Sequence, residues 1–181
     1  MDVFSHGLWT GAISKLINNK LKKPISILQT AFWGVFPDLF AFTIAFVWLS
    51  GSLFLGKISP SAMPGLHEVE PSPLNTNPIF HLTSLLYSIG HSAIIFILAF
   101  SVLWFILRRP YWELFGWFFH ILIDIPTHSY RFYPTPVFWP LSSWKFDGFS
   151  WGNIWFIAID YTAIIAVYFF LIIKKYKKAR A

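Results

Sequence analysis

The feature that most constrains this chain is a set of long apolar stretches that charged residues hardly interrupt. Hydrophobic residues make up 56% of its 181 residues and charged residues only 12%, whereas a soluble domain has about 25% charged residues. A helix that crosses a bilayer needs about 20 apolar residues. The sequence therefore predicts an all-α, polytopic membrane helical bundle that forms a single domain over residues 1–181.

Four apolar stretches are candidate membrane spans. The second and fourth have about the length that one crossing requires, and the third is short. The first is too long for one straight span, and Pro37 removes a helical hydrogen bond, so a helix broken at Pro37-Asp38 is an open alternative. The expected spans cover residues 25–55, 87–107, 111–127 and 154–173.

The remaining segments predict one amphipathic helix and two loops. Residues 3–17 predict an N-terminal helix that lies at the membrane surface or partly inserts. Residues 59–86 and 129–152 predict extracytoplasmic loops, and the second is aromatic enough to lie as a cap on the outer membrane surface. The apolar side of the N-terminal helix would be formed by Val3, Leu8, Ala12 and Leu16.

Basic residues predict how the chain is oriented. They cluster before the first span, between the second and third spans, and after the fourth, and such clusters stay on the cytoplasmic side. We therefore expect a multi-pass protein of the cytoplasmic (inner) membrane with both termini cytoplasmic and the lipid bilayer as its partner. No readable motif accompanies the basic tail, so we expect no specific nucleic-acid partner. The clusters comprise Lys15, Lys20, Lys22, Lys23, Arg108, Arg109, Lys174, Lys175, Lys177, Lys178 and Arg180.

Within the third stretch, His120, Asp124 and His128 follow one another at intervals of four residues. Such residues drift by only about 40° per step around a helix, so all three can share one face. Ionisable groups are costly in hydrocarbon and are usually paired, directed at a cavity or bound to something. Two imidazoles and a carboxylate suit a zinc-type cation, and the chain has no cysteine to offer a thiolate.

Other ionisable residues in apolar sequence are candidates for the same site. His91 falls at a depth similar to that of the triplet, and Asp38 can reach them if the first helix breaks. Structural explanations remain open for each residue: a hydrogen-bonded core histidine for His91, a helix N-cap for Asp38, the membrane interface for His128, and helix packing for Asp160.

Four segments carry a family resemblance: SHGLWTGAI, GVFPDLF, GHSAIIF and HILIDIPTHSYRFYPTPVFWPLSSWKFDG. In this order, over roughly residues 4–150, they resemble the YdjM-like family of membrane-bound metal-dependent hydrolases. Many members carry an H-R-G-x-T-H-S motif where this chain reads LYSIGHS, so the first His and the Arg are missing. This chain either lacks their role or supplies it elsewhere, from His128 or Arg131. The family's early His, Pro-Asp, His-Ser and H-x-x-x-D fall on His6, Asp38, His91-Ser92 and His120 with Asp124.

That family is distantly similar to zinc-dependent phospholipase C and P1-type nucleases, which implies hydrolysis of a phosphoester or lipid-like substrate by a metal-activated water. The cofactor implied is Zn²⁺ or a similar divalent metal, as one or more ions. Asp38 and Asp124 would be catalytic and could bridge two ions, and Arg131 would bind the substrate phosphate. The metal ligands implied are His6, Asp38, His91, His120, Asp124 and His128.

Two other classes of function are compatible with the same residues. A small ion- or proton-relay or transport protein would use Asp38, Asp124, Asp160 and the histidines. A non-catalytic membrane protein would use the His–Asp pairs to fix helix packing. A relay would need Asp160, which the hydrolase pattern does not use, and a transporter of this size would usually contain repeats, of which the sequence shows none.

Overall fold

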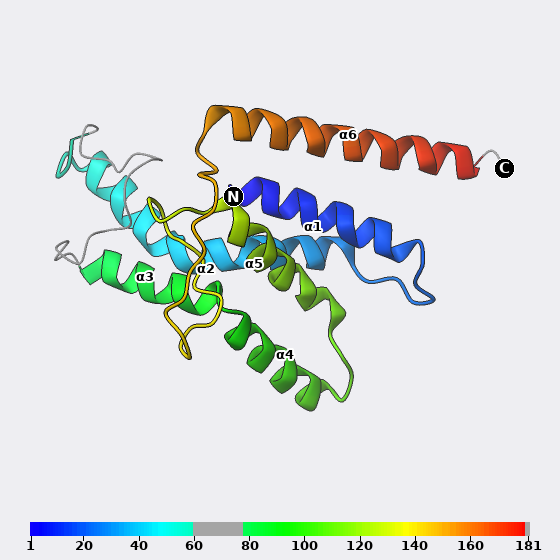
Figure 1. Ribbon diagram of the computed structural model, residues 1–181, viewed down its shortest axis with the longest axis horizontal. Coiled ribbons are helices and arrows are strands. Elements are labelled where there is room, and N and C mark those ends of the chain that lie inside the picture. Colours follow the sequence, from blue (N-terminus) through cyan, green and yellow to red (C-terminus); the bar gives the residue numbers. More distant parts are fainter. Residues whose placement is uncertain (60–77, 180–181) are drawn as a thin grey trace.

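The computed structural model of the chain describes residues 1–59 and 78–179. These residues form helices and no strand, which confirms the predicted all-α class (Figure 1). Residues 60–77, part of the predicted loop 59–86, lie outside the described residues. The helices are α1 (Val3–Asn18), α2 (Ile27–Phe54), α3 (Pro78–Gly90), α4 (Ala93–Leu107), the short 3-10 helix η2 (Trp112–Leu114), α5 (Phe115–Thr127) and α6 (Ile154–Ala179).

Two helices, α2 and α6, are long and apolar enough to cross a membrane, and α3 with α4 makes a third candidate if this pair, bent by 63°, counts as one span. The four predicted spans are therefore not all found. The predicted third span contains the short η2 and α5, and the 13 residues of α5 reach only about 20 Å of a hydrocarbon core about 30 Å thick. Only 11% of the apolar window of α6 is buried inside the protein, as expected for a helix that faces lipid.

The helix break lies at a different place from the one that the sequence suggested. Helix α2 continues through Pro37. The proline removes one backbone hydrogen bond of the helix, but the helix is intact on either side of it. The break comes between α3 and α4, where Ser92 caps α4 by accepting hydrogen bonds from two backbone amides. Helix α3 also begins at Pro78, so the predicted loop 59–86 extends too far.

Helix α1 is present as predicted, but it buries the opposite kind of surface. Asp2 caps its first turn by accepting from the amides of Phe4 and Ser5. Of the apolar side that we predicted, Leu16 is 38% exposed but Ala12 is buried, and Phe4, which we did not assign to that side, is 77% exposed. The outward side of α1 is therefore only partly the one expected. The buried side of α1 carries polar or small residues. Small residues allow the backbone of α1 to approach the neighbouring helices closely. Its buried residues are Ser5, His6, Thr10, Gly11, Ala12 and Ser14.

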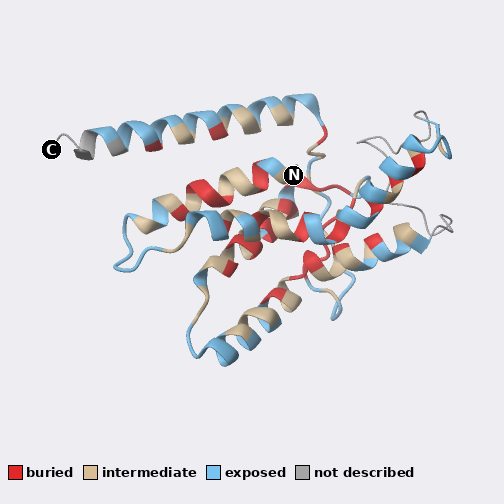
Figure 2. Cartoon of the chain, turned by 180° about the vertical axis from the view of Figure 1, so that it is seen from behind, coloured by how far each residue is buried: buried red, intermediate tan, exposed pale blue. Residues whose placement is uncertain are grey.

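Glycines bring α1, α2 and α5 into close contact. A Cβ atom on Gly34 of α2 would lie 2.2 Å from the Thr10 hydroxyl of α1, and one on Gly116 of α5 would lie 2.0 Å from the Thr30 carbonyl of α2. Small residues allow helix backbones to approach in this way. Buried residues concentrate where these helices meet (Figure 2).

The aromatic segment after α5 is only partly the surface cap that we predicted. Residues 133–137 are buried, and the amide of Ala93 donates to the Val137 carbonyl at the break between α3 and α4. The chain then returns along the end of α5, where the Phe149 amide bonds the Pro126 carbonyl. Its large exposed side chains are Phe138, Leu141, Trp144, Phe146 and Phe149.

The basic segments gather towards one end of the bundle. Helix α1 ends, α2 begins and α6 ends on the same side of the molecule (Figure 1). Helix α1 starts beside the first turns of α6, where the Tyr161 hydroxyl donates to Asp2. The described N-terminal residue is therefore inside the bundle, at the opposite end of α6 from the basic tail. The cytoplasmic placement of both termini stays a prediction.

The close contact at Gly116 predicts the effect of adding one methyl group. Gly116→Ala should lower the stability by roughly 1–3 kcal/mol, because the backbone of α2 must move away. Gly51→Ala on α2 is the matched control, since nothing lies within 4 Å of its Cβ position. Thermal unfolding in detergent measures both changes. Equal effects of the two substitutions would contradict the close packing of α5 on α2.

Candidate metal centre

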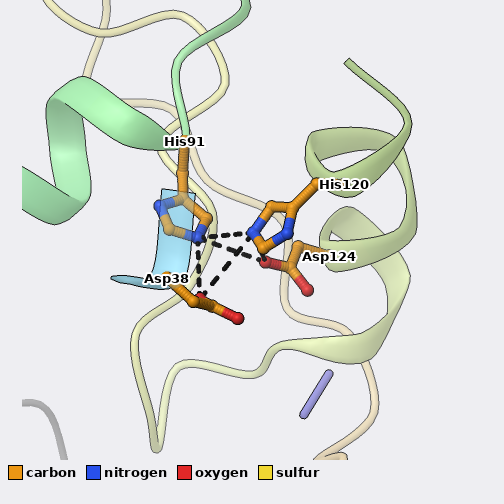
Figure 3. Close-up of side chains that lie close together, drawn as sticks. All are labelled: Asp38, His91, His120 and Asp124. Carbon is orange, nitrogen blue, oxygen red and sulfur yellow. Dashed lines mark hydrogen bonds and ion pairs between the residues drawn. The ribbon is translucent and has the colours of Figure 1, made fainter. Parts of the chain in front are cut away.

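Six of the predicted site residues come together in the centre of the bundle. His6 comes from α1, Asp38 from α2, and His91 from the break between α3 and α4. His120 and Asp124 lie one turn apart on α5, and His128 follows directly after that helix. All six side chains are buried. Figure 3 shows four of them, Asp38, His91, His120 and Asp124, directed at a common point.

Backbone carbonyls hold three of the histidines in a fixed orientation. The Nδ1 atoms of His91, His120 and His128 lie 3.0, 2.7 and 2.8 Å from the carbonyls of Tyr87, Gly34 and Tyr133. A carbonyl cannot donate, so each Nδ1 must carry the proton, and each Nε2 directs a lone pair into the site. This is the arrangement that orients histidines as metal ligands.

The ligand atoms of Asp38, His91, His120 and Asp124 have the spacing of a coordination shell. All four lie within 4.8 Å of one another. His91 Nε2 is 3.3 Å from Asp124 Oδ2 and 3.4 Å from Asp38 Oδ1, and His120 Nε2 is 3.1 and 3.8 Å from the same atoms. Four ligands placed tetrahedrally at about 2.0–2.1 Å from zinc are separated by about 3.3 Å.

The electrostatics of this group favour a positive charge among its ligand atoms. The Nε2 atoms of His91 and His120 are only 2.9 Å apart, although both carry lone pairs when Nδ1 is protonated. Asp38 Oδ2 and Asp124 Oδ2 are buried without a hydrogen-bond partner among the described residues. Buried carboxylate oxygens without partners are costly, and a cation at the common point would be bound by Asp38 Oδ1, Asp124 Oδ2 and the two Nε2 atoms.

The second oxygen of Asp124 faces a different set of groups. Asp124 Oδ1 lies 2.9 Å from His6 Nε2, 3.3 Å from His128 Nε2 and 2.7 Å from the ammonium group of Met1. That ammonium also lies 2.7 Å from His128 Nε2. Asp124 therefore joins two groups, one around Oδ1 that already contains a positive charge and one around Oδ2 that does not.

The surroundings of His6 and His128 favour neutral imidazoles. His6 stacks on His120 with ring centroids 3.7 Å apart. Among the described residues, its Nδ1 has no hydrogen-bond partner, and its Nε2 contacts only Asp124 Oδ1. Burial lowers the pKa of His128, and the Met1 ammonium lowers it further, against the opposing effect of Asp124. Neutral imidazole is the form that binds a metal.

A separate polar network attaches α6 beside the site. Asp160 accepts from the Ser5 hydroxyl at 2.7 Å and from the Trp9 indole at 2.8 Å, so it joins α6 to α1. The Ser5 hydroxyl also lies 2.6 Å from Asp2. Burial on its own raises the pKa of Asp2, but hydrogen bonds from Ser5, Tyr161 and Phe4 outweigh it and hold the pKa below its ordinary value.

One predicted residue does not join the cluster. The side chain of Arg131 is exposed in the aromatic segment, outside the buried group. Sequence reasoning also missed the residues that orient the histidines. All three contribute backbone carbonyls. Tyr87 lies one helical turn before His91, so its spacing was a usable signal, whereas no sequence pattern marks Gly34 or Tyr133.

The carbonyl contacts predict the tautomers of the histidines. In ¹⁵N nuclear magnetic resonance of histidine-labelled protein, His91, His120 and His128 should be protonated at Nδ1 only. His81, which is exposed on α3 and lies outside the site, is the control. A proton on Nε2 of His91 or His120 would contradict the orientation of the site.

Comparison of the chain with protein-family models, with curated proteins and with solved structures found no match. The resemblance to the YdjM-like family therefore stays an expectation that rests on the short motifs around the site residues. The geometry itself shows a buried group of two aspartates and two histidines that could hold a metal ion. From its structure, the protein is an all-helical chain with helices able to cross a membrane and a candidate metal centre.

Proposed function

We propose that this chain is a membrane-bound metal-dependent hydrolase. One observation carries the proposal: Asp38, His91, His120 and Asp124 converge in the buried centre of the bundle, with their ligand atoms within 4.8 Å of one another. A purely structural His–Asp pair needs one donor for each acceptor. Here two imidazole lone pairs face each other and two carboxylate oxygens lack donors, which suits an ion better than a hydrogen-bonded core.

The donor set favours zinc. Two imidazole nitrogens and two carboxylate oxygens, all within 4.8 Å of one another, match the ligands and the tetrahedral spacing that Zn²⁺ takes in proteins. Mg²⁺ prefers oxygen ligands in an octahedron and seldom binds imidazole. A second ion at Asp124 Oδ1, with His6 and His128, would have to displace the Met1 ammonium that lies 2.7 Å from that oxygen, and Asp124 would then bridge the two ions.

The site residues would have different roles in the reaction. When bound, the ion would acidify a coordinated water and polarise a phosphoryl oxygen. His91 and His120 are held by backbone carbonyls and would keep the ion in one position. Asp38 Oδ2 has no hydrogen-bond partner among the described residues, so it is free to accept a proton from the attacking water. Asp124 would bind through Oδ2 while Oδ1 keeps its contacts with His6 and His128.

The substrate class that we propose is a phosphoester or lipid-like molecule delivered by the membrane. The resemblance described above supports phosphoester chemistry, and the candidate spans α2 and α6 support a lipid environment. The aromatic segment 131–152 carries exposed side chains such as Trp144 and Phe149 beside the site. Arg131 is exposed in the same segment, where it would attract the phosphate before the substrate reaches the ion.

The first test of this proposal is metal content. Purified wild-type protein should contain at least about one zinc or similar ion per chain, measured by elemental analysis. His120→Ala should lose most of it, because His120 is one of the four proposed ligands of the ion. His81→Ala is the matched control, since His81 is exposed on α3. Metal retained at full stoichiometry in both His120→Ala and Asp124→Ala would exclude the site.

The second test is catalysis. The wild-type protein should hydrolyse a chromogenic phosphodiester or a phospholipid, and Asp38→Asn should lower kcat by at least about 10²-fold if Asp38 acts as the general base. A chelator should abolish the activity, and added zinc should restore it. Proteoliposomes that pass protons or metal ions and show no chelator-sensitive hydrolysis would instead support the relay class of function.

A further inference from the structure

A second feature of the molecule lies on the other side of α1 from the metal centre. An apolar groove of about 550 Å³ runs between α1, α2 and α6, within the range of about 300–1,000 Å³ that is typical of small-molecule sites. Gly7 and Gly11 form part of its wall, and Tyr168 closes one side by donating from its hydroxyl to the Leu8 carbonyl at 2.9 Å. The groove is lined by Phe4, Gly7, Leu8, Gly11, Ile27, Leu28, Ala31, Val35 and Tyr168.

The lining of this groove is suited to an acyl chain. Its described walls are almost wholly apolar, and α2 and α6, which form two of them, are the two helices able to cross a membrane by themselves. Leu28 is 80% and Phe4 77% exposed at its edges, so the groove opens towards the lipid. Inside a bilayer, a hydrocarbon chain fills such a space without leaving any polar group unpaired.

Basic residues stand at one end of the groove. Gly11 and Ile27 mark that end, and Lys15 follows Gly11 by one turn on the same face of α1. The segment that joins α1 to α2 carries Lys20, Lys22 and Lys23, all exposed, and α6 carries the exposed Lys174 about two turns beyond Tyr168. These elements end or begin on the same side of the molecule (Figure 1).

From the apolar groove and the lysines at its end, we propose that one anionic phospholipid binds here, with an acyl chain between α1, α2 and α6 and its phosphate on the lysines. The charge pattern selects the headgroup, because a zwitterionic lipid gains little from several lysines. The bound lipid would fill the space beneath α6, which otherwise reaches α1 chiefly through the polar contacts of Asp160, Tyr161 and Tyr168.

This lipid is distinct from the proposed substrate. Lys15 lies nine residues beyond His6 along α1, which is about 13 Å on a helix. A phosphate held by the lysines therefore cannot reach the ligand atoms of the metal centre. On the helical wheel, Gly7 and Gly11 also face away from His6. The proposal does not depend on the metal site or on catalysis.

The experiment titrates purified protein in a nonionic detergent with phosphatidylglycerol or with phosphatidylcholine of the same acyl chains. Native mass spectrometry counts the bound lipids, and thermal unfolding measures the change in Tm. We expect one retained phosphatidylglycerol and a higher Tm with it than with phosphatidylcholine. Ala31→Phe, which fills the groove, should abolish both effects.

A second pair of variants tests the headgroup contact without changing helix packing. Lys22→Gln with Lys23→Gln should weaken phosphatidylglycerol binding by about fivefold per lysine. Arg108→Gln with Arg109→Gln, at the junction of α4 and α5, removes the same charge elsewhere and should have little effect. Val102→Phe places a phenylalanine on the exposed side of α4 instead, and this variant should also bind normally.

Two results would overturn the proposal. The first is equal retention of phosphatidylglycerol and phosphatidylcholine by the wild-type protein. The second is equal weakening by the two charge-removing double variants, which would indicate only a general surface attraction. Zinc content should stay unchanged in all these variants, so a failure of this proposal can be distinguished from a failure of the metal site.

Discussion

The structure depends on the burial of two carboxylates, Asp38 and Asp124, in the middle of an apolar bundle. Burying a charge is costly unless it is paired, and both residues have an oxygen without a hydrogen-bond partner among the described residues. The imidazoles around them present lone pairs rather than protons, because their Nδ1 atoms are committed to backbone carbonyls. A cation at the common point resolves both problems at once, and this is why we place a metal there.

The close packing of the helices brings the residues of this site together. Gly34 and Gly116 let α1, α2 and α5 approach closely, so that His6, Asp38 and His120 converge although they are far apart in the chain. The break between α3 and α4 directs His91 inward, and the buried part of the segment after α5 closes over that break. In a protein whose outer surface faces lipid, the polar side chains gather inside and the apolar ones outside, which is the pattern that α1 displays.

The sequence was sufficient to predict the helical class and most of the candidate site. The spacing of His120 and Asp124 placed both on one face of a helix, and His91 was marked by its isolation in apolar sequence. Hydropathy could not show that α5 is too short to cross the membrane or that α2 continues through Pro37, since both depend on packing with neighbours. The polar face of α1 and the exposed position of Arg131 likewise follow from tertiary contacts that no local pattern records.

X-ray absorption spectroscopy at the zinc edge of the purified protein tests the central claim most directly. The account predicts about four nitrogen or oxygen ligands at about 2.0–2.1 Å, with the multiple-scattering signature of two imidazoles and with one imidazole lost in His91→Ala. A spectrum without imidazole scattering, or one that His91→Ala leaves unchanged, would show that the buried cluster is not where the metal binds.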